Sequence, residues 1–455
     1  MIYIYIYFVF LSVFLQFFFY FFLIGFSLQL VRLSMEVGIE HFQMLHNLNK
    51  HRRDEMICFK ENGHEYTIDV SRAQELANIE NHQGDDKVVP HSQEVLRNIL
   101  KWEKLHPKDE QKNKEAWQKG TSVTTIIQKY FPAFDADAVI ARMRKSANWT
   151  RSKYFGMTND EIKSLWQCIG DRSREDGHNI HARIEDHFNG KSTFIPDYLA
   201  EHEDTSPPTS KEGKNCKMYR QFLNWLQQNP SVKPFRTEWC LFSDHKSLIC
   251  GTPDFISLTE GYSSYNNSLP GVYSTDEYDA ALESLKRRKR AKLQGGTGAD
   301  EKKPHLENFV PEQDVLRLEQ SEPRVSSCKL HVTIYDWKTC RKIDMKNFYK
   351  DGKGFAPFDK LPNTNFSHYV VQLNMYKYML EKFYKYVEVE GVVHKGIIVD
   401  GMWLMCVNPG FEDYQQYFVP PLTNGEIETV FQNRELELAS ELNICLPTTS
   451  THTES

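Results

Sequence analysis

The sequence predicts a protein of the α/β class, in which helices and strands alternate along the chain. Two segments carry this prediction. Residues 330–338 alternate apolar and polar side chains, which is typical of a half-buried strand. Residues 369–384 place apolar side chains three and four positions apart, the spacing of an amphipathic helix. The chain has 455 residues, of which 40% are hydrophobic, so it can form one large domain with additions or two domains.

The N-terminal residues 1–34 differ from the rest of the chain. Residues 1–31 carry no charged side chain and are long enough to cross a bilayer. They lack the basic start and small-residue cleavage site of a secretory signal. Two interpretations remain open: a membrane anchor, or an over-extended start ahead of Met35, which the monotony of Phe, Tyr and Ile favours. Residues 35–120 form a polar N-terminal extension with a helix predicted over residues 92–105.

The middle of the chain is predicted to contain a helix followed by two strands. The helix, over residues 177–188, places His181 and Glu185 on one face because they are four positions apart. Residues 235–242 and 247–256 are predicted as strands joined by a polar hairpin loop. The second strand contains the breakers Gly251 and Pro253, and Asp254 lies beside the break.

The strand over residues 330–338 ends in a charged pair. Side chains two apart on a strand share a face, so Asp336 and Lys338 continue the apolar stripe that begins at Leu330. An apolar stripe that ends in charged side chains predicts a buried strand that opens into a polar site. In the helix over residues 369–384, Gln372 and Tyr376 share a face.

The order of these polar residues resembles the PD-(D/E)XK nuclease superfamily, most closely its RecB-like and viral-exonuclease-like branch. The matching pieces are Gly177-x-x-x-His181-x-x-Ile184-Glu185, Gly251-Thr252-Pro253-Asp254, Asp336-Trp337-Lys338 and Gln372-x-x-x-Tyr376. The resemblance covers residues 120–260 and 328–435. It implies a restriction-endonuclease-like core, in which helices flank a central mixed β-sheet and a metal site lies at one edge. The two parts of that core are residues 121–260 and 328–442, and the second is predicted to include a strand over 396–407 and a helix over 424–442.

The resemblance also implies a site for phosphodiester hydrolysis. Divalent ions activate water and stabilise charge on phosphate oxygens. Asp254 and Asp336 are the implied ligands of Mg²⁺ or Mn²⁺, because hard ions prefer oxygen donors. His181 matches the position of a metal-binding histidine, and imidazole suits Mn²⁺ better than Mg²⁺. Lys338 is the implied residue that orients the attacking water or stabilises charge at the phosphate.

Four further residues are candidates for supporting roles. The resemblance implies that Gln372 and Tyr376 contact DNA and brace the site. It also implies that Glu185 completes the metal site through a water or holds a neighbouring side chain in place. Glu238 lies shortly before the Asp254 strand and is a candidate second acid, although a basic cross-strand partner would explain it equally well.

Structural explanations remain open for several of these residues. Asp254 next to Pro253 would also suit a turn. Gln372 and Tyr376 would also form the polar edge of a helix packed through Leu373. Three histidines between residues 178 and 187 suggest zinc, but no cysteine pair at ligand spacing lies nearby, so no zinc site is expected.

Charge limits how this chain could bind its expected partner, DNA. The net charge of −6 gives no overall attraction to nucleic acid, so contacts must come from local basic clusters. One cluster, in residues 142–153, is interleaved with Trp149 and followed by Tyr154. Basic and aromatic side chains together suit phosphates and stacked bases, and a solvated helix face would give the same pattern.

Residues 261–327 separate the two parts of the expected core. They are rich in Ser, Asn, Gly and charge, so a disordered insertion is predicted. The basic run Lys286–Arg290 fits a nuclear localisation patch, a DNA-holding arm or plain solvated disorder. The polar tail, residues 443–455, is also predicted to be disordered.

The nine cysteines are scattered and include no Cys-x-x-Cys pair, which fits a reducing, intracellular compartment. Some RecB-like nucleases hold an iron–sulfur cluster through three cysteines that follow the core. Here only Cys406 and Cys445 follow the helix of Gln372, so no cluster is expected.

The expected function is metal-dependent hydrolysis of single- or double-stranded DNA, with ends preferred. An exonuclease of recombination, repair or viral-type replication is favoured, because that is the branch the chain resembles. The alternatives are a structure-selective endonuclease and a catalytically inactive DNA-binding module of the same fold. A membrane partner is expected only if residues 1–31 are translated.

Overall fold

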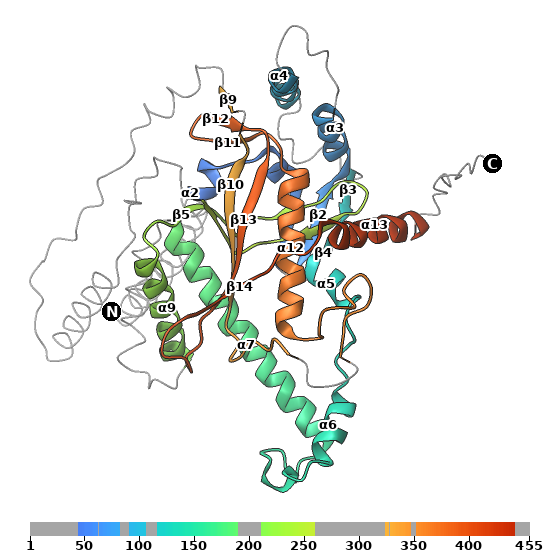
Figure 1. The fold of residues 1–455 in the computed structure, drawn as a ribbon, viewed down its shortest axis with the longest axis vertical. Coiled ribbons are helices and arrows are strands. Elements are labelled where there is room, and N and C mark those ends of the chain that lie inside the picture. Colours follow the sequence, from blue (N-terminus) through green and yellow to red (C-terminus); the bar gives the residue numbers. More distant parts are fainter. Residues whose placement is uncertain are drawn as a thin grey trace, which may run out of the picture.

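The computed structural model describes residues 44–61, 63–81, 91–105, 116–189, 211–259, 324–326, 328–346 and 352–441. These residues form a mixed α/β structure with helices around a central sheet (Figure 1), so the predicted α/β class is confirmed. The predictions for residues 1–34, Lys286–Arg290 and residues 443–455 lie outside the described residues. None of the helices in the described part combines the length and apolar composition that a membrane crossing requires.

The central sheet has five strands and is mixed. Its order is β14 (Gln415–Phe418), β13 (Ile397–Cys406), β10 (Leu330–Lys338), β8 (Phe255–Leu258) and β5 (Lys233–Thr237). Strand β10 runs parallel to β13 and antiparallel to β8, and the outer pairs are antiparallel. The bounds of β10 are those predicted from the alternation of residues 330–338.

Successive side chains of β10 point to opposite faces of the sheet, and apolar side chains on both faces are covered by helices. Leu330, Val332 and Ile334 are fully buried in a cluster with α12 (Asn365–Phe383) and α5 (Val123–Gln128). On the other face, Tyr335 and Trp337 pack with α7 (Asn159–Phe188) and α9 (Lys211–Gln228). Figure 1 shows α12 beside the sheet and the long helix α7 running away from it.

Three small sheets and several helices surround this core. The small sheets are β4 (Thr121–Ser122), β7 (Ile249–Gly251) and β6 (Leu241–Phe242); β1 (Ile57–Lys60), β2 (Glu65–Asp69) and β3 (Trp117–Lys119); and β11 (Val387–Val389), β12 (Val392–His394) and β9 (Arg324–Ser326). The remaining helices are α2 (Met44–Leu48), η1 (Arg52–Met56), α3 (Val70–Glu80), α4 (His91–Leu105), α6 (Ala136–Arg144), η3 (Trp149–Arg151) and α13 (Asn424–Glu441).

Most predicted elements are present, with small changes at their ends. The predicted helices over 92–105, 177–188, 369–384 and 424–442 correspond to α4, the last part of α7, α12 and α13, and the predicted strand over 396–407 corresponds to β13. The predicted insertion extends too far, because Arg324–Ser326 form β9 and pair in parallel with β12.

Two predicted strands are each divided between two sheets. Residues 235–242 form β5 and β6, because Glu238 has a φ of 41° that turns the chain out of the central sheet. Residues 247–256 form β7 and β8, interrupted at Pro253, whose nitrogen cannot donate to a strand ladder. The predicted hairpin survives between β6 and β7.

Candidate metal centre

Three neighbouring strands of the central sheet end at the same edge. Thr237 of β5 pairs with Phe255 of β8, and Phe255 pairs with Tyr335 of β10. Because β8 is antiparallel to both neighbours, its first residue lies beside the last residue of β5 and beside Tyr335, three residues before the end of β10. The next residue beyond this row is acidic in each case: Glu238, Asp254 and Asp336. The sheet register therefore brings together carboxylates that are far apart in the sequence.

His181, Glu238 and Asp254 converge on one point. One ligand atom from each residue lies within 4.8 Å of the others. His181 Nδ1 is 3.6 Å from both Glu238 Oε1 and Asp254 Oδ1. Helix α7 supplies the imidazole, while the ends of β5 and β8 supply the carboxylates. One nitrogen and two carboxylate groups at this spacing form a donor set for a single divalent cation.

The main chain of Trp337 fixes the orientation of two of these residues. Its N–H donates a 2.6 Å hydrogen bond to Asp254 Oδ2, and its carbonyl oxygen lies 3.0 Å from His181 Nε2. A carbonyl can only accept, so Nε2 carries the hydrogen. In the neutral imidazole, Nδ1 then has a free lone pair directed at the carboxylates. The Trp337 side chain is buried against α7 and α9, which holds this peptide in place.

The charges around His181 favour a cation at this point. Burial lowers the pKa of His181, but Asp254 and Glu238 outweigh it and raise the pKa to about 9. Burial also raises the pKa of Asp254, even though His181 and Lys338 oppose that change. In the absence of another cation, the imidazolium is the positive charge nearest to these two carboxylates.

Asp336 and Lys338 form a buried ion pair next to the three converging residues. Lys338 Nζ lies 2.5 Å from Asp336 Oδ2, and the side chains are 18% and 0% exposed. Neither Asp336 oxygen has a hydrogen bond of ordinary geometry from a residue that the structure describes. Burial raises the pKa of Asp336 to about 6. Burial lowers the pKa of Lys338, but Asp336 and Asp254 outweigh it, so the ammonium stays charged.

Gln372 and Tyr376 brace the turn before Asp254. Gln372 Nε2 donates to Tyr376 Oη at 3.0 Å. A Cβ on Gly251 would lie 2.4 Å from Tyr376 Cε1, so only glycine allows this ring to pack against the turn. Leu373 is fully buried on the same helix. Helix α12 therefore serves as a core element and also supports the turn that carries Asp254.

Glu185 is not among the three residues whose ligand atoms converge. It lies one turn after His181 on α7 and is half-buried. His187, two residues further, is buried and its Nδ1 lies 2.8 Å from Tyr219 Oη. Within the described residues, no cysteine belongs to the convergent group.

Three contributors to this region carry no signal in the sequence. The main chain of Trp337 acts through its peptide groups, which no side-chain pattern can indicate. Tyr66, from the N-terminal extension, places its hydroxyl 2.9 Å from Thr252 Oγ1 in the turn before Asp254. The ring of Tyr369 lies with its centre 5.0 Å from Lys338 Nζ. All three contacts join segments that are distant along the chain.

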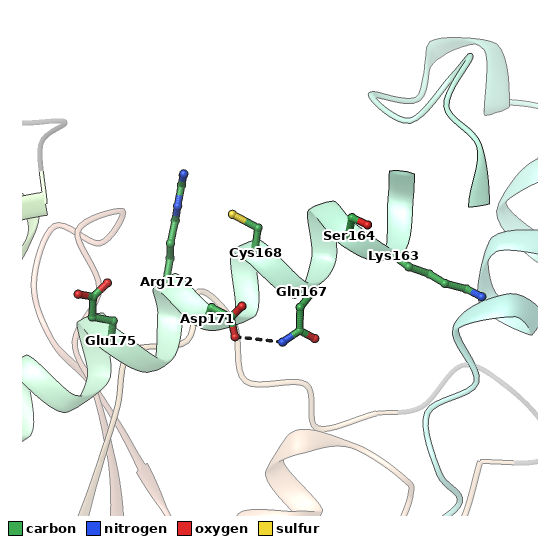
Figure 2. A pocket seen from close by; sticks show the side chains of 7 residues that line it. All are labelled: Lys163, Ser164, Gln167, Cys168, Asp171, Arg172 and Glu175. Atoms are coloured by element: carbon green, nitrogen blue, oxygen red, sulfur yellow. Dashed lines mark hydrogen bonds between the residues drawn. The ribbon is translucent and has the colours of Figure 1, made fainter. Parts of the chain in front are cut away.

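A shallow hollow of about 610 Å³ lies elsewhere, along α7 (Figure 2). Its lining residues carry both charge signs, and Gln167 donates to Asp171 there at 3.0 Å. None of the predicted site residues lines it. The predicted site residues therefore lie away from this hollow.

Comparisons with known proteins assign no family. No family model matches this chain, and no curated protein matches its sequence.

Proposed function

We propose that this protein is a metal-dependent DNA nuclease with a restriction-endonuclease-like core of the PD-(D/E)XK type. The observation that carries this proposal is the convergence of His181, Glu238 and Asp254 within 4.8 Å at a sheet edge. The buried ion pair of Asp336 and Lys338 lies on the neighbouring strand. Acids for a metal and a charged lysine beside them are what phosphodiester hydrolysis requires.

The donor set fits Mg²⁺ or Mn²⁺. Glu238 and Asp254 offer the oxygen ligands that hard ions prefer, and His181 Nδ1 adds a nitrogen that suits Mn²⁺. Asp336 supports the fit, because its Oδ1 is buried and has no hydrogen bond from a described residue, while its Oδ2 contacts Lys338. A bound ion would lower the pKa of a water and stabilise negative charge on the phosphate.

The chain's own residues supply the remaining chemistry. The side chain of Lys338 is more exposed than that of Asp336, so its ammonium can donate to a water or to a phosphate oxygen. Asp336 keeps that ammonium charged and holds it in position. The peptide of Trp337 presents Asp254 and the correct tautomer of His181, so the donors need little rearrangement.

The arrangement of the fold supports the proposed core. A mixed sheet lies between α7 and α12, and these elements carry the polar residues in the order that the nuclease superfamily shows. We further propose that the enzyme acts on DNA ends as an exonuclease, because the sequence resembles that branch. A structure-selective endonuclease and an inactive DNA-binding module are the other outcomes of the test.

The test is cleavage of end-labelled linear DNA and circular DNA by the protein, in Mg²⁺, Mn²⁺ or EDTA. Asp254→Ala is the site variant. Asp400→Ala is the matched control, because Asp400 lies on β13 of the same sheet and pairs with exposed His331 instead. We expect metal-dependent loss of linear DNA with the wild type and the control, and none with Asp254→Ala.

Each other result changes the assignment. Cleavage of the circle would establish an endonuclease. Binding without cleavage in either metal would favour the inactive module. Equal cleavage by Asp254→Ala and the wild type would mean that the site is wrongly assigned.

A further inference from the structure

A basic and aromatic surface lies at the start of α7, far from the candidate metal centre. We define the arm as residues 136–157, which contain α6, η3 and the turn that leads into α7. Residues 141–155 contain no acidic side chain, although the whole chain has a net charge of −6. Their basic side chains are Arg142, Arg144, Lys145, Arg151 and Lys153. The arm is therefore a local reversal of the overall charge.

The arm is fixed to the first turns of α7. Trp166 Nε1 donates to Tyr154 Oη at 2.9 Å, and Lys163 forms a 2.7 Å ion pair with Asp137. Arg144 donates to the side-chain oxygen of Asn159, the first residue of α7, at 3.0 Å. These contacts join the arm to a helix that continues into the core, so the arm has a defined position relative to the centre.

The arm exposes cations together with aromatic rings. Lys145, Arg151 and Lys153 are exposed, and none of them forms an ion pair with a carboxylate in the described residues. Phe155 is 56% exposed, and its ring centre lies 6.3 Å from that of Trp149. Cations that track phosphates, placed beside rings on which bases can stack, are the features of single-strand binding surfaces.

The distance from the arm to the centre matches a short strand of DNA. Helix α7 is continuous from Asn159 to Phe188, so its 1.5 Å rise per residue places Asn159 about 33 Å from His181. That length corresponds to at most about ten nucleotides, because 3.4 Å is the spacing in a stacked strand of duplex DNA and an extended single strand needs fewer. Figure 1 shows α6 at the end of α7 that is away from the central sheet. The hollow of Figure 2 lies on α7, between the arm and His181.

We propose that the arm binds single-stranded DNA up to about ten nucleotides away from the bond that is cut. This inference rests on the proposed nuclease function. Single strands fit better than duplex because the exposed rings can stack only on unpaired bases. The arm thereby makes cleavage depend on substrate length: long strands reach both the arm and the centre, and short strands reach the centre alone.

The experiment compares two triple charge reversals in the full-length protein. The arm variant is Lys145→Glu, Arg151→Glu and Lys153→Glu. The control variant is Arg97→Glu, Lys101→Glu and Lys104→Glu, three exposed positions on α4 at the opposite end of the molecule (Figure 1). Both variants change the net charge equally. Fluorescence anisotropy in EDTA measures binding to a thirty-nucleotide oligo-dT and to a blunt thirty-base-pair duplex. Cleavage of the oligo-dT and of a four-nucleotide strand, which is too short to reach the arm from the centre, is measured with Mn²⁺.

We expect the arm variant to bind the thirty-nucleotide strand more weakly than the control does. A plot of log affinity against log salt has a negative slope, and its magnitude should decrease by about 2. Each of the three lost phosphate contacts removes about 0.7 from it. Cleavage of the thirty-nucleotide strand should slow, while cleavage of the four-nucleotide strand should match the control. Phe155→Ala should weaken binding with no change in salt slope.

Three results would overturn the proposal. Equal binding by the arm and control variants would mean that the arm is a solvated surface, while cleavage by the wild type would leave the nuclease assignment standing. Loss confined to blunt duplex would exclude single strands as the ligand. A wild type that neither binds nor cleaves DNA would overturn both the arm and the nuclease function.

Discussion

Asp54 and Arg236 form a buried ion pair, with Asp54 Oδ2 2.8 Å from Arg236 Nη1. The other oxygen of Asp54 accepts a 2.7 Å hydrogen bond from Trp239 Nε1. Asp54, a residue of the N-terminal extension, thus binds side chains on both sides of Glu238 in the sequence. Glu238 itself has the positive φ that turns the chain out of the central sheet. The extension is therefore expected to help position a metal ligand.

Asp54→Ala should destabilise the protein and weaken its metal binding. Removing one partner leaves the Arg236 guanidinium buried and unpaired, which costs about 3–5 kcal/mol. Urea denaturation and Mn²⁺ titration measure the two effects. Glu65→Ala is the control, because the Lys119–Glu65 pair is exposed and surface ion pairs contribute little to stability. Equal losses in the two variants would contradict a positioning role for Asp54.

Gly251→Ala should lower both stability and cleavage. The added Cβ would lie 2.4 Å from Tyr376 Cε1 and 3.1 Å from Val123 Cγ2, so the ring must move away from the turn that carries Asp254. Overpacking of this kind costs about 1–3 kcal/mol. Gly425→Ala, on α13 in open space, should have no such effect. Thermal unfolding measures stability, and a DNA cleavage assay measures the rate. Equal melting temperatures and equal cleavage rates for the two variants would disprove the expectation.

Without metal, stability should fall as the pH rises through the range in which His181 loses its proton. The pKa of this imidazole is raised from 6.5 to about 9 by Asp254 and Glu238 against the effect of burial. Its contribution is therefore complete below pH 6.5 and is lost as the pH rises to about 9, with an upper limit of about 3 kcal/mol. Thermal unfolding in EDTA at several pH values measures this change.

His181→Gln should remove that pH dependence, whereas His331→Gln, at an exposed position of β10, should retain it. Metal should bind more tightly as the pH rises over the same range, since a ligand at Nδ1 must displace the proton. A wild-type pH profile that matches that of His181→Gln would show that this imidazolium does not stabilise the fold.

Lys338→Ala should abolish cleavage and also destabilise the fold. The substitution leaves the carboxylate of Asp336 fully buried without its partner, which costs about 3–5 kcal/mol. The double variant Asp336→Asn, Lys338→Met removes both charges and should recover much of this loss while remaining inactive. Urea denaturation with cleavage assays separates the two effects. Wild-type cleavage by either variant would refute the assigned roles of the pair.

The sequence by itself determined the elements with strong periodicity and the polar residues that they carry. Strand β10 has its predicted bounds because nine alternating residues leave only one register that buries Leu330, Val332 and Ile334. Helix α12 follows from its apolar spacing in the same way. These local patterns alone, without any tertiary contact, place Asp336 and Lys338 on one face of a strand and Gln372 near Tyr376 on one face of a helix.

Only the tertiary structure decided which acids meet. Glu238 joins His181 and Asp254 because β5 pairs with β8 although β6 and β7 lie between them in the sequence, and because a left-handed turn at Glu238 redirects its chain. Neither pairing between strands nor a positive φ at a glutamate has a signature in side-chain periodicity. The same holds for the peptide of Trp337 and for Asp54, which act on residues more than 80 positions away. The sequence therefore determines the elements with strong periodicity, while long-range packing assembles the centre.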